Sequence, residues 1–221
     1  MAHYAGYGGA VYKAAYIKTD TIAFHENDTL DDTITDSNSG FIDAQFAAED
    51  EITVDGSTSN DGDYTIDTVV AGTITLDTGD DLVEESAGGM VTIIKKAPGT
   101  VTSGFYGWEL NDGREIADVT DFNSANGWRE FMPTLRRWTA TLDRYWDASN
   151  NEQSILGVPQ VFRFFIKYEA EPGAYVPATY YEGIGIINEM PVSVPVGEIV
   201  TQRISVTGLG AIVQKTQTTD W

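Results

Sequence analysis

The sequence has no cysteine and only two histidines, which narrows the chemistry open to it. Without cysteine there can be no disulfide framework, thiolate metal site or cysteine nucleophile. Nothing beside His3 or His25 in the sequence marks a metal site or a Ser-His-Asp triad. A carboxylate pair of the kind used in glycoside hydrolysis stays open, because any two of the 34 acidic residues could meet in space. We expect no enzyme activity, no cofactor and no resident metal.

Long apolar runs are missing as well. No stretch approaches the roughly 20 apolar residues that cross a membrane. The start MAHYAGYGGAVYK lacks a basic segment followed by an apolar core, so we expect no signal peptide. Hydrophobic residues still make up 42% of the 221 residues, which is enough for a buried core. The length fits one large β domain or two smaller domains.

Positive charge is scarce, with 13 Lys and Arg against 34 Asp and Glu and a net charge of −21. This charge argues against wrapping nucleic acid by neutralising its phosphates, and it favours solubility. The acidity is uneven, because the segment from Lys18 to Ala97 holds 19 Asp and Glu but only three Lys, a net charge of −16. We therefore expect compositional boundaries near Ile17 and Ala97.

Apolar and polar residues alternate through the acidic segment. The pattern occurs in EITVDG, DYTID, GTITLD and GGMVTII, and turn residues such as Asn60-Asp61-Gly62 separate these stretches. Period-2 alternation bounded by turns is typical of β-strands with one solvated face. The sequence thus predicts a small inserted all-β domain over residues 18–97.

The flanking sequence is also strand-like. Alternating stretches are GGAVYKAAY, TVTSGFYGWEL, WTATLDRYW and VFRFFIKYEA, followed by EGIGIINEMPVSV and IVTQRISVTGLGAI. We expect a turn at Asn111-Asp112-Gly113, because these residue types favour turns. In VFRFFIKYEA we expect Phe162 and Phe164 to face away from Phe165.

One stretch has a helical period instead. The spacing i, i+3, i+4, i+7 of an amphipathic helix is met by Trp128, Phe131, Met132 and Leu135. Ser124 or Asn126 can cap such a helix, and Pro133 is tolerated only near its first turn. We expect one short helix of about two turns here, with its apolar stripe on a sheet. The predicted fold is therefore mainly β, a β-sandwich or barrel with one short flanking helix and the inserted domain.

The acidic turns do not match a calcium loop. Neither Asp55 nor Asp61 as first ligand places a Gly at the sixth position and a Glu at the twelfth. The group Asp80, Asp81, Glu84 and Glu85 could hold a cation weakly. A solvated acidic edge, which discourages unwanted sheet pairing, is the better interpretation.

Arginine and large aromatic residues gather between Thr120 and Asp147. This stretch holds Arg129, Arg136, Arg137 and Arg144 together with three tryptophans. Trp, Tyr and Arg are the residue types enriched at protein–protein hot spots. In so acidic a chain, such a patch would find complementary charge on an identical neighbour. Self-assembly explains both the arginines and the aromatic residues, and ion pairing within one subunit is the competing interpretation.

The stretch GREIADVTDFNSANGWREFMPTLRRWTATLDRYWD, Gly113 to Asp147, resembles the central segment of major tail tube proteins of long-tailed bacteriophages. The matching motifs are DVT-x-F from Asp118, WREF-x-x-x-L from Trp128 and W-x-x-x-L-x-x-x-W-D from Trp138. GGAVYK and the segment from Glu182 to Ile212 are similar to the family's first and last strands. The resemblance covers residues 1–17 and 98–221, which would form the tail-tube β-sandwich domain.

The resemblance implies a structural protein of the virion tail, assembled in the host cytoplasm. Six copies would form a ring, and stacked rings would make the conduit for DNA. Other partners would be the tape-measure protein and the tail terminator and tip proteins. DNA would pass without specific binding, and no membrane would be involved. The implied subunit-contact residues are Asp118, Asp121, Phe122, Arg129, Arg136, Arg137 and Arg144.

The acidic segment 18–97 departs from the family pattern. It looks like a small β module inserted into a phage structural protein, and we expect it on the outer wall of the tube because it would block a channel. The alternative function is a virion-associated or secreted β-rich binding module that recognises a carbohydrate or a host-surface ligand.

Overall fold

The computed structural model describes residues 10–27, 30–96, 100–101, 105–121, 128–146, 155–166 and 179–216. No α-helix occurs in these ranges, and the expected mainly β fold class is confirmed. The strands are β1 (Ala10–Ala14), β2 (Tyr16–Thr19), β3 (Ile22–His25), β4 (Thr33–Asp36), β5 (Glu51–Asp55), β6 (Gly62–Val70), β7 (Thr73–Leu76), β8 (Val91–Lys95), β9 (Thr100–Val101), β10 (Phe105–Asp118), β11 (Phe131–Tyr145), β12 (Pro159–Phe165), β13 (Thr179–Glu189), β14 (Val192–Ser193) and β15 (Thr201–Thr216).

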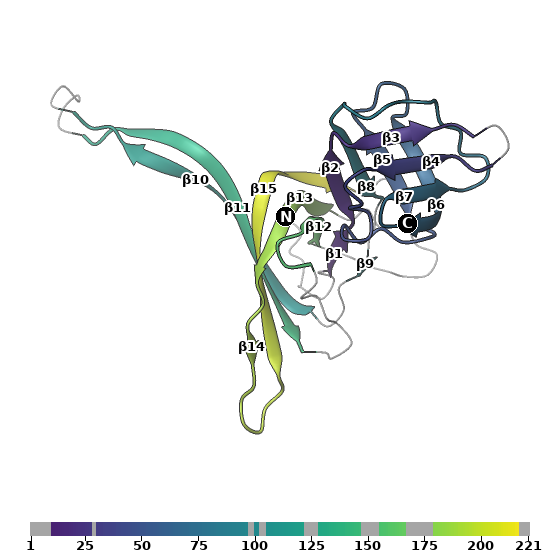
Figure 1. Ribbon diagram of the computed structural model, residues 1–221. Helices are drawn as coiled ribbons and strands as arrows, with labels where there is room; N and C mark the ends of the chain where they lie inside the picture. Colours follow the sequence, from purple (N-terminus) through teal and green to yellow (C-terminus); the bar gives the residue numbers. More distant parts are fainter. Residues whose placement is uncertain are drawn as a thin grey trace.

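The strands form two antiparallel sheets (Figure 1). The first has the order β10-β11-β15-β13-β12-β1-β9, with β14 paired to β15. The second has the order β2-β8-β5-β6-β7-β4-β3. Its strands run from Tyr16 to Lys95, so β2 begins two residues before the predicted boundary at residue 18. The division into two domains itself stays a prediction.

The second sheet folds over on itself around a single apolar core. Strand β6 pairs with β5 through its first half and with β7 through its second, and the register shifts between Ile66 and Thr68. Such a bulge bends a strand and lets the sheet turn back. One cluster then buries residues from both halves, including Ile22, Phe24, Ile34, Ile52 and Ile93.

Strand β12 carries the core of the first sheet on both of its faces. Phe162 and Phe164 pack into a cluster with Trp138, Leu142 and Val206. On the opposite face Phe165 packs against two tyrosines, Tyr12 and Tyr180. Successive side chains of a strand point to opposite faces, so this arrangement follows directly from the alternation predicted for this stretch.

Buried polar groups join the two sheets. Gln160 donates from Nε2 to the carbonyl oxygen of Ala44 at 3.3 Å, and Arg163 donates from Nη2 to that of Lys95 at 3.3 Å. Arg163 also donates from Nε to Glu182 at 2.7 Å. Both Gln160 and Arg163 are buried. Because buried polar groups are costly unless hydrogen-bonded, these contacts fix where the second sheet sits on the first.

The predicted short helix over Trp128–Leu135 is wrong. Residues Phe131 to Tyr145 form strand β11 and pair with β10. Pro133 is accommodated because the register shifts beside it: Arg114 opposes Arg136 but Ile116 opposes Pro133, which leaves one extra residue in β11. Proline inside a sheet is found at such bulges and on edges, where no ladder hydrogen bond is lost.

The predicted turn at Asn111-Asp112-Gly113 is also wrong. These residues lie inside β10 and oppose Thr139, Trp138 and Arg137 of β11. Residues 111–118 therefore belong to a long hairpin. The pairing of β10 with β11 overrode both local signals, one on each strand.

Candidate assembly interface

A two-stranded arm extends from one end of the first sheet (Figure 1). The ladder between β11 and β15 ends at the pair Thr139–Thr207. Beyond it, β11 pairs only with β10, from Trp138 opposite Asp112 to Phe131 opposite Asp118. We call the described residues 111–121 and 128–137 the arm.

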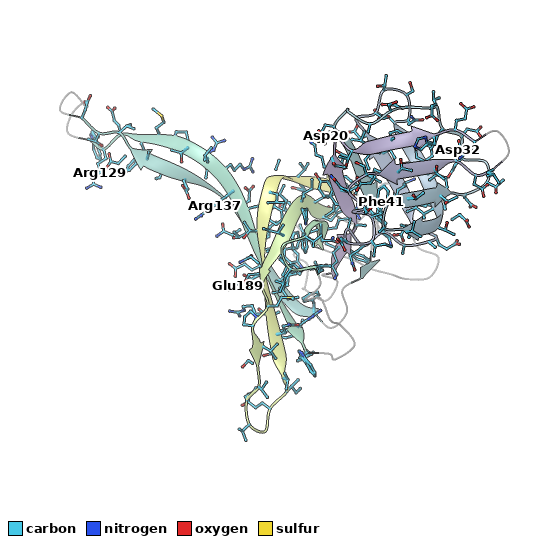
Figure 2. The ribbon with its side chains drawn as sticks, viewed as in Figure 1. Asp20, Asp32, Phe41, Arg129, Arg137 and Glu189 are labelled. Carbon is cyan, nitrogen blue, oxygen red and sulfur yellow. The ribbon has the colours of Figure 1, made fainter. Side chains whose placement is uncertain are left out.

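Cross-strand ion pairs run along the arm. Arg136 binds Asp112 through two hydrogen bonds, from Nε at 2.9 Å and from Nη2. Arg137 Nη1 lies 3.4 Å from Glu115 Oε1, nearer the body of the protein, and Arg129 Nη1 lies 3.8 Å from Asp118 Oδ2 at the distal end (Figure 2). The hydrogen bonds from Arg136 lower the pKa of Asp112. Exposed pairs of this kind add little to stability because water screens them, so they align the hairpin more than they stabilise it.

The arm is nearly neutral in a chain of net charge −21. Residues 111–121 and 128–137 hold five acidic and four arginine side chains. Net charge of one sign keeps copies of a protein apart. The arm is therefore a part of the molecule that can approach another copy without strong repulsion.

Large apolar side chains of the arm are exposed. Trp128 is 76% exposed and Leu135 is 82% exposed, and the others are Ile116, Val119, Phe131 and Met132. The stripe that the sequence predicted to cover a sheet thus faces solvent. Large apolar side chains exposed together on one element of a soluble protein mark a site that binds a partner.

The predicted contact arginines lie in two different environments. Arg129, Arg136 and Arg137 lie together on the arm and are exposed. Arg144 is instead 1% exposed, donates from Nε and Nη2 to Gln202 Oε1 at 2.9 and 2.6 Å, and lies over the ring of Phe105. We leave it out of the interface, because no neighbouring subunit can reach a buried guanidinium.

The acidic members lie at the distal end of the arm. Asp118 is the last residue of β10 and accepts hydrogen bonds from the hydroxyl and the amide of Thr120, which lower its pKa. Asp121 is exposed next to it. Phe122 lies outside the described residues.

A second apolar projection was not predicted as a contact site. The segment between β13 and β15 forms a hairpin at the other end of the sheet from the arm, with β14 on it (Figure 1). Its exposed apolar side chains are Val192, Val194, Val196 and Ile199. We call residues 190–200 the valine hairpin. In the sequence this segment is MPVSVPVGEIV, an apolar stretch with few polar residues, and this composition could have indicated a contact site.

Strand β10 supplies an unprotected edge. It is the end strand of the first sheet among the described residues, and at fourteen residues it is long. Such an edge presents backbone N–H and C=O groups that can template another strand. At the opposite edge of the sheet, β9 pairs only with Tyr12 and Lys13 of β1.

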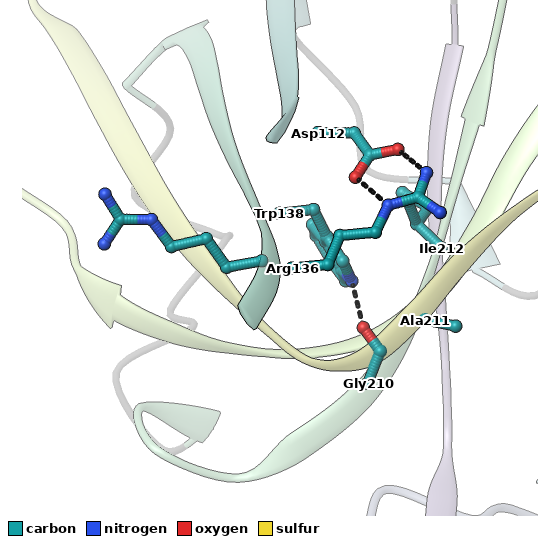
Figure 3. Close-up of a pocket in the computed structure, with 7 residues that line it drawn as sticks. Asp112, Arg136, Trp138, Gly210, Ala211 and Ile212 are labelled. Carbon is teal, nitrogen blue, oxygen red and sulfur yellow. Dashed lines mark hydrogen bonds and ion pairs between the residues drawn. The ribbon is translucent and has the colours of Figure 1, made fainter. Parts of the chain in front are cut away.

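A pocket of about 190 Å³ lies where the arm leaves the sheet (Figure 3). Its lining is Asp112, Arg136, Arg137, Trp138, Gly210, Ala211 and Ile212. This volume is smaller than the roughly 300–1,000 Å³ of typical ligand sites. The pocket therefore has room for one or two side chains and little more.

Three of the acidic residues that could hold a cation, Asp80, Glu84 and Glu85, have structural partners. Glu85 accepts from the backbone amides of Thr58 and Ser59, which lower its pKa. His25 hydrogen-bonds Glu84 through Nδ1 at 3.1 Å, and Asp80 accepts from the Thr65 amide. These contacts pin loops together.

Two further features are absent from the described part of the chain. No cluster of three or more His, Cys, Asp or Glu residues there is arranged to hold a metal ion. No helix there is long and apolar enough to cross a membrane.

Comparison with known proteins adds little. No protein-family model matches the chain, and no curated protein sequence matches it. One similar solved structure is a chain from the virion of a native gene transfer agent particle, with a TM-score of 0.40 and 14% sequence identity. The match covers 52% of this chain and 88% of that chain. A likeness with a TM-score below 0.5 carries no functional argument, so the function is inferred from the geometry of the arm and from the sequence motifs.

Proposed function

We propose that this chain is a structural virion protein without catalytic activity, the subunit of a bacteriophage tail tube. Copies assemble into hexameric rings, and the rings stack into a conduit for DNA. The observation that carries this proposal is the arm, which exposes large apolar residues and is nearly neutral while the chain is strongly acidic. Such a surface is typical of a site that another subunit covers.

The arrangement of the first sheet supports ring formation. Its two edges are the long strand β10 and the short strand β9. The β10 edge of one copy can pair with the β9 edge of a neighbouring copy. Ring closure would remove both edges, as closure does in barrels. The arm and the valine hairpin project from opposite ends of this sheet, which suits a second, head-to-tail contact between rings.

The second sheet is assigned to the outer wall of the tube. It is joined to the first sheet at the β12 side, away from the arm. Its net charge, −16 over residues 18–97, would keep particles dispersed there. Negative charge of the chain would also keep DNA from adhering in the bore, since charges act over a Debye length of about 8 Å at physiological salt. Tape-measure, terminator and tip proteins are the further partners of this proposal.

Light scattering over a concentration series tests the proposal with a matched pair of variants. Leu135 on the arm and Leu30, between β3 and β4 of the second sheet, are similarly exposed, at 82% and 77%. We expect Leu135→Asp to raise the concentration needed for assembly by about tenfold or more, because an interface hot spot contributes about 2 kcal/mol. Leu30→Asp should leave assembly unchanged.

The outcomes separate this function from a binding module. If the wild-type chain is a monodisperse monomer that binds a carbohydrate saturably, the tail-tube assignment fails. Equal loss of assembly in both leucine variants would show a general effect of added charge, and it would remove the arm from the interface.

A further inference from the structure

Strands β11 and β15 separate at Trp138. Their ladder ends at Thr139 and Thr207. Trp138 and the residues before it in β11 pair only with β10 and lead into the arm, whereas β15 continues from Gly208 beside β13. Trp138 is thus the first residue of β11 beyond the shared ladder, and whatever holds its side chain also holds the root of the arm.

Three glycines make room for the indole ring of Trp138. A Cβ atom on Gly208 would lie 2.3 Å from Cε2 and Nε1 of Trp138. One on Gly185 would lie 2.8 Å from Cη2, and one on Gly183 would lie 2.9 Å from Cζ2. All three distances are below any real Cβ contact, so no other residue fits at these positions without displacing the ring. We call Gly183, Gly185 and Gly208 the glycine slot.

The register between β13 and β15 shifts at the glycine slot. Gly183 opposes Ile212 but Gly185 opposes Gly208, so β15 has two extra residues across this interval. A bulge of this kind bends a strand and re-aims its neighbours. Trp138 donates from Nε1 to the carbonyl oxygen of Gly210, inside the bulge, at 3.0 Å (Figure 3). This bond joins the two strands again just after their ladder has ended.

The remainder of the ring is held by the core. Trp138 is 2% exposed and meets Phe164 edge to face, with ring centroids 6.1 Å apart. The indole therefore contacts the glycine slot, lies nearly perpendicular to Phe164 of the core and donates its N–H to the bulge. A buried ring held by these contacts leaves its strand little freedom to tilt.

We propose that Trp138, seated in the glycine slot, is the positioning residue that sets the direction in which the arm leaves the sheet. Its role in assembly rests on the proposed function, because a neighbouring subunit meets the arm residues only if the arm points at it. Its role in fixing the arm is a property of one chain and stands without assembly.

The test measures the arm direction in single subunits. Because the chain has no cysteine, Met132→Cys on the arm and Ser193→Cys on β14 give two unique positions for spin labels. Six residues from Trp138 to Met132, at about 3.3 Å each, make a lever of about 20 Å, so a tilt of about 10° moves the label by about 3 Å. Distances are recorded by pulsed electron resonance at concentrations below assembly.

Gly208→Ala and Gly210→Ala form a matched pair on one strand. A Cβ on Gly210 meets nothing within 4 Å, whereas one on Gly208 enters the indole. We expect Gly208→Ala to change the mean distance between the two spin labels by several ångströms, or to double roughly the width of the distance distribution. Both estimates use the lever of about 20 Å from Trp138 to Met132. Gly210→Ala should match the parent. Trp138→Phe, which lacks the N–H donor to Gly210, should broaden the distance in the same way.

Each result has one meaning. An unchanged distance in Trp138→Phe and in Gly208→Ala overturns the proposal, and if Gly208→Ala does not fold, Trp138→Phe decides alone. A displaced arm together with normal assembly keeps the positioning role but removes it from assembly. Failure of the parent chain to assemble overturns the proposed function and leaves the distance measurement valid.

Discussion

Ion pairs of single side chains at the junction help to fix the two sheets together. Glu182 on β13 accepts from Arg163 Nε at 2.7 Å and also from Lys215. Burial raises the pKa of Glu182, but the charge of Arg163 and the hydrogen bonds from Lys215 and Arg163 outweigh burial and hold the pKa below its ordinary value of 4.5. Arg163 in turn donates to the second sheet, so the carboxylate supports the junction indirectly.

Replacing Glu182 should destabilise the chain and change its response to acid. Glu182→Gln leaves the buried Arg163 without its carboxylate, and we expect a loss of about 3 kcal/mol in the free energy of unfolding. The folded-state pKa is lowered, so this stabilisation is present above pH 4.5 and is lost as the pH falls through the lowered value. Urea unfolding at pH 7 and at pH 3.5 measures both effects.

The difference between the parent and Glu182→Gln should therefore shrink toward acid pH. Many other carboxylates titrate in the same range, which is why the comparison is made between variants. A constant difference across this pH range would contradict the assigned pairing.

At the scale of elements, the arm is where the prediction from sequence and the structure differ most. Its stretch stands out in the sequence for its arginines and aromatic residues, but the local pattern predicts a helix preceded by a turn. Helical spacing of Trp128, Phe131 and Leu135 is a local signal, and pairing with β10 is a non-local one that no window of sequence contains. Where strands alternated and turned within short spans, as in β5 to β8, the prediction agreed with the structure.

The burial of Arg144 could be predicted from the sequence only in part. It shares the alternating face of Trp138, Ala140 and Leu142, which are all buried, so its position on the strand did indicate the core. What the sequence could not supply was Gln202, a partner 58 residues away that makes burial of the charge tolerable. The glycine slot could not be predicted from the sequence, because glycine residues locally indicate turns. Only the fold brings three of them against one indole ring.

The arm arginines can be tested for contact with a neighbour as opposed to pairing within the arm. Arg136→Glu with Arg137→Glu places like charges beside Asp112 and Glu115, and we expect assembly to weaken by about tenfold or more, with unchanged circular dichroism. Adding Asp112→Arg and Glu115→Arg restores pairing inside the arm with the signs exchanged.

The exchanged variant discriminates between the two interpretations. Assembly should stay weak if the arginines meet acidic groups of another subunit. Recovery of assembly to the parent level, read by light scattering, would limit their role to aligning the hairpin.

At the scale of the whole molecule, two sheets with separate cores share one chain. The strands of each sheet pair only within that sheet among the described residues, and the second sheet interrupts the chain between β1 and β9. Those two strands are antiparallel neighbours, with Tyr12 opposite Val101 and Lys13 opposite Thr100. A short turn can therefore join them.

Removal of residues 16–95 tests the outward placement of the second sheet. With a short glycine-containing turn in their place, we expect the first sheet to fold and assemble, because its ladders stay intact and the freed Gln160 and Arg163 gain access to water. Cryo-electron microscopy of parent and shortened tubes should differ only on the outer wall. Lost density in the bore would place the second sheet inside and contradict the assignment.

Electron microscopy of the purified full-length chain, negatively stained over a range of concentrations and salt, tests the central claim most directly. We expect six-fold rings at moderate concentration and stacked rings or tubes at high concentration, since the arm and the β10 edge are completed by further copies. Single particles under every condition would contradict it.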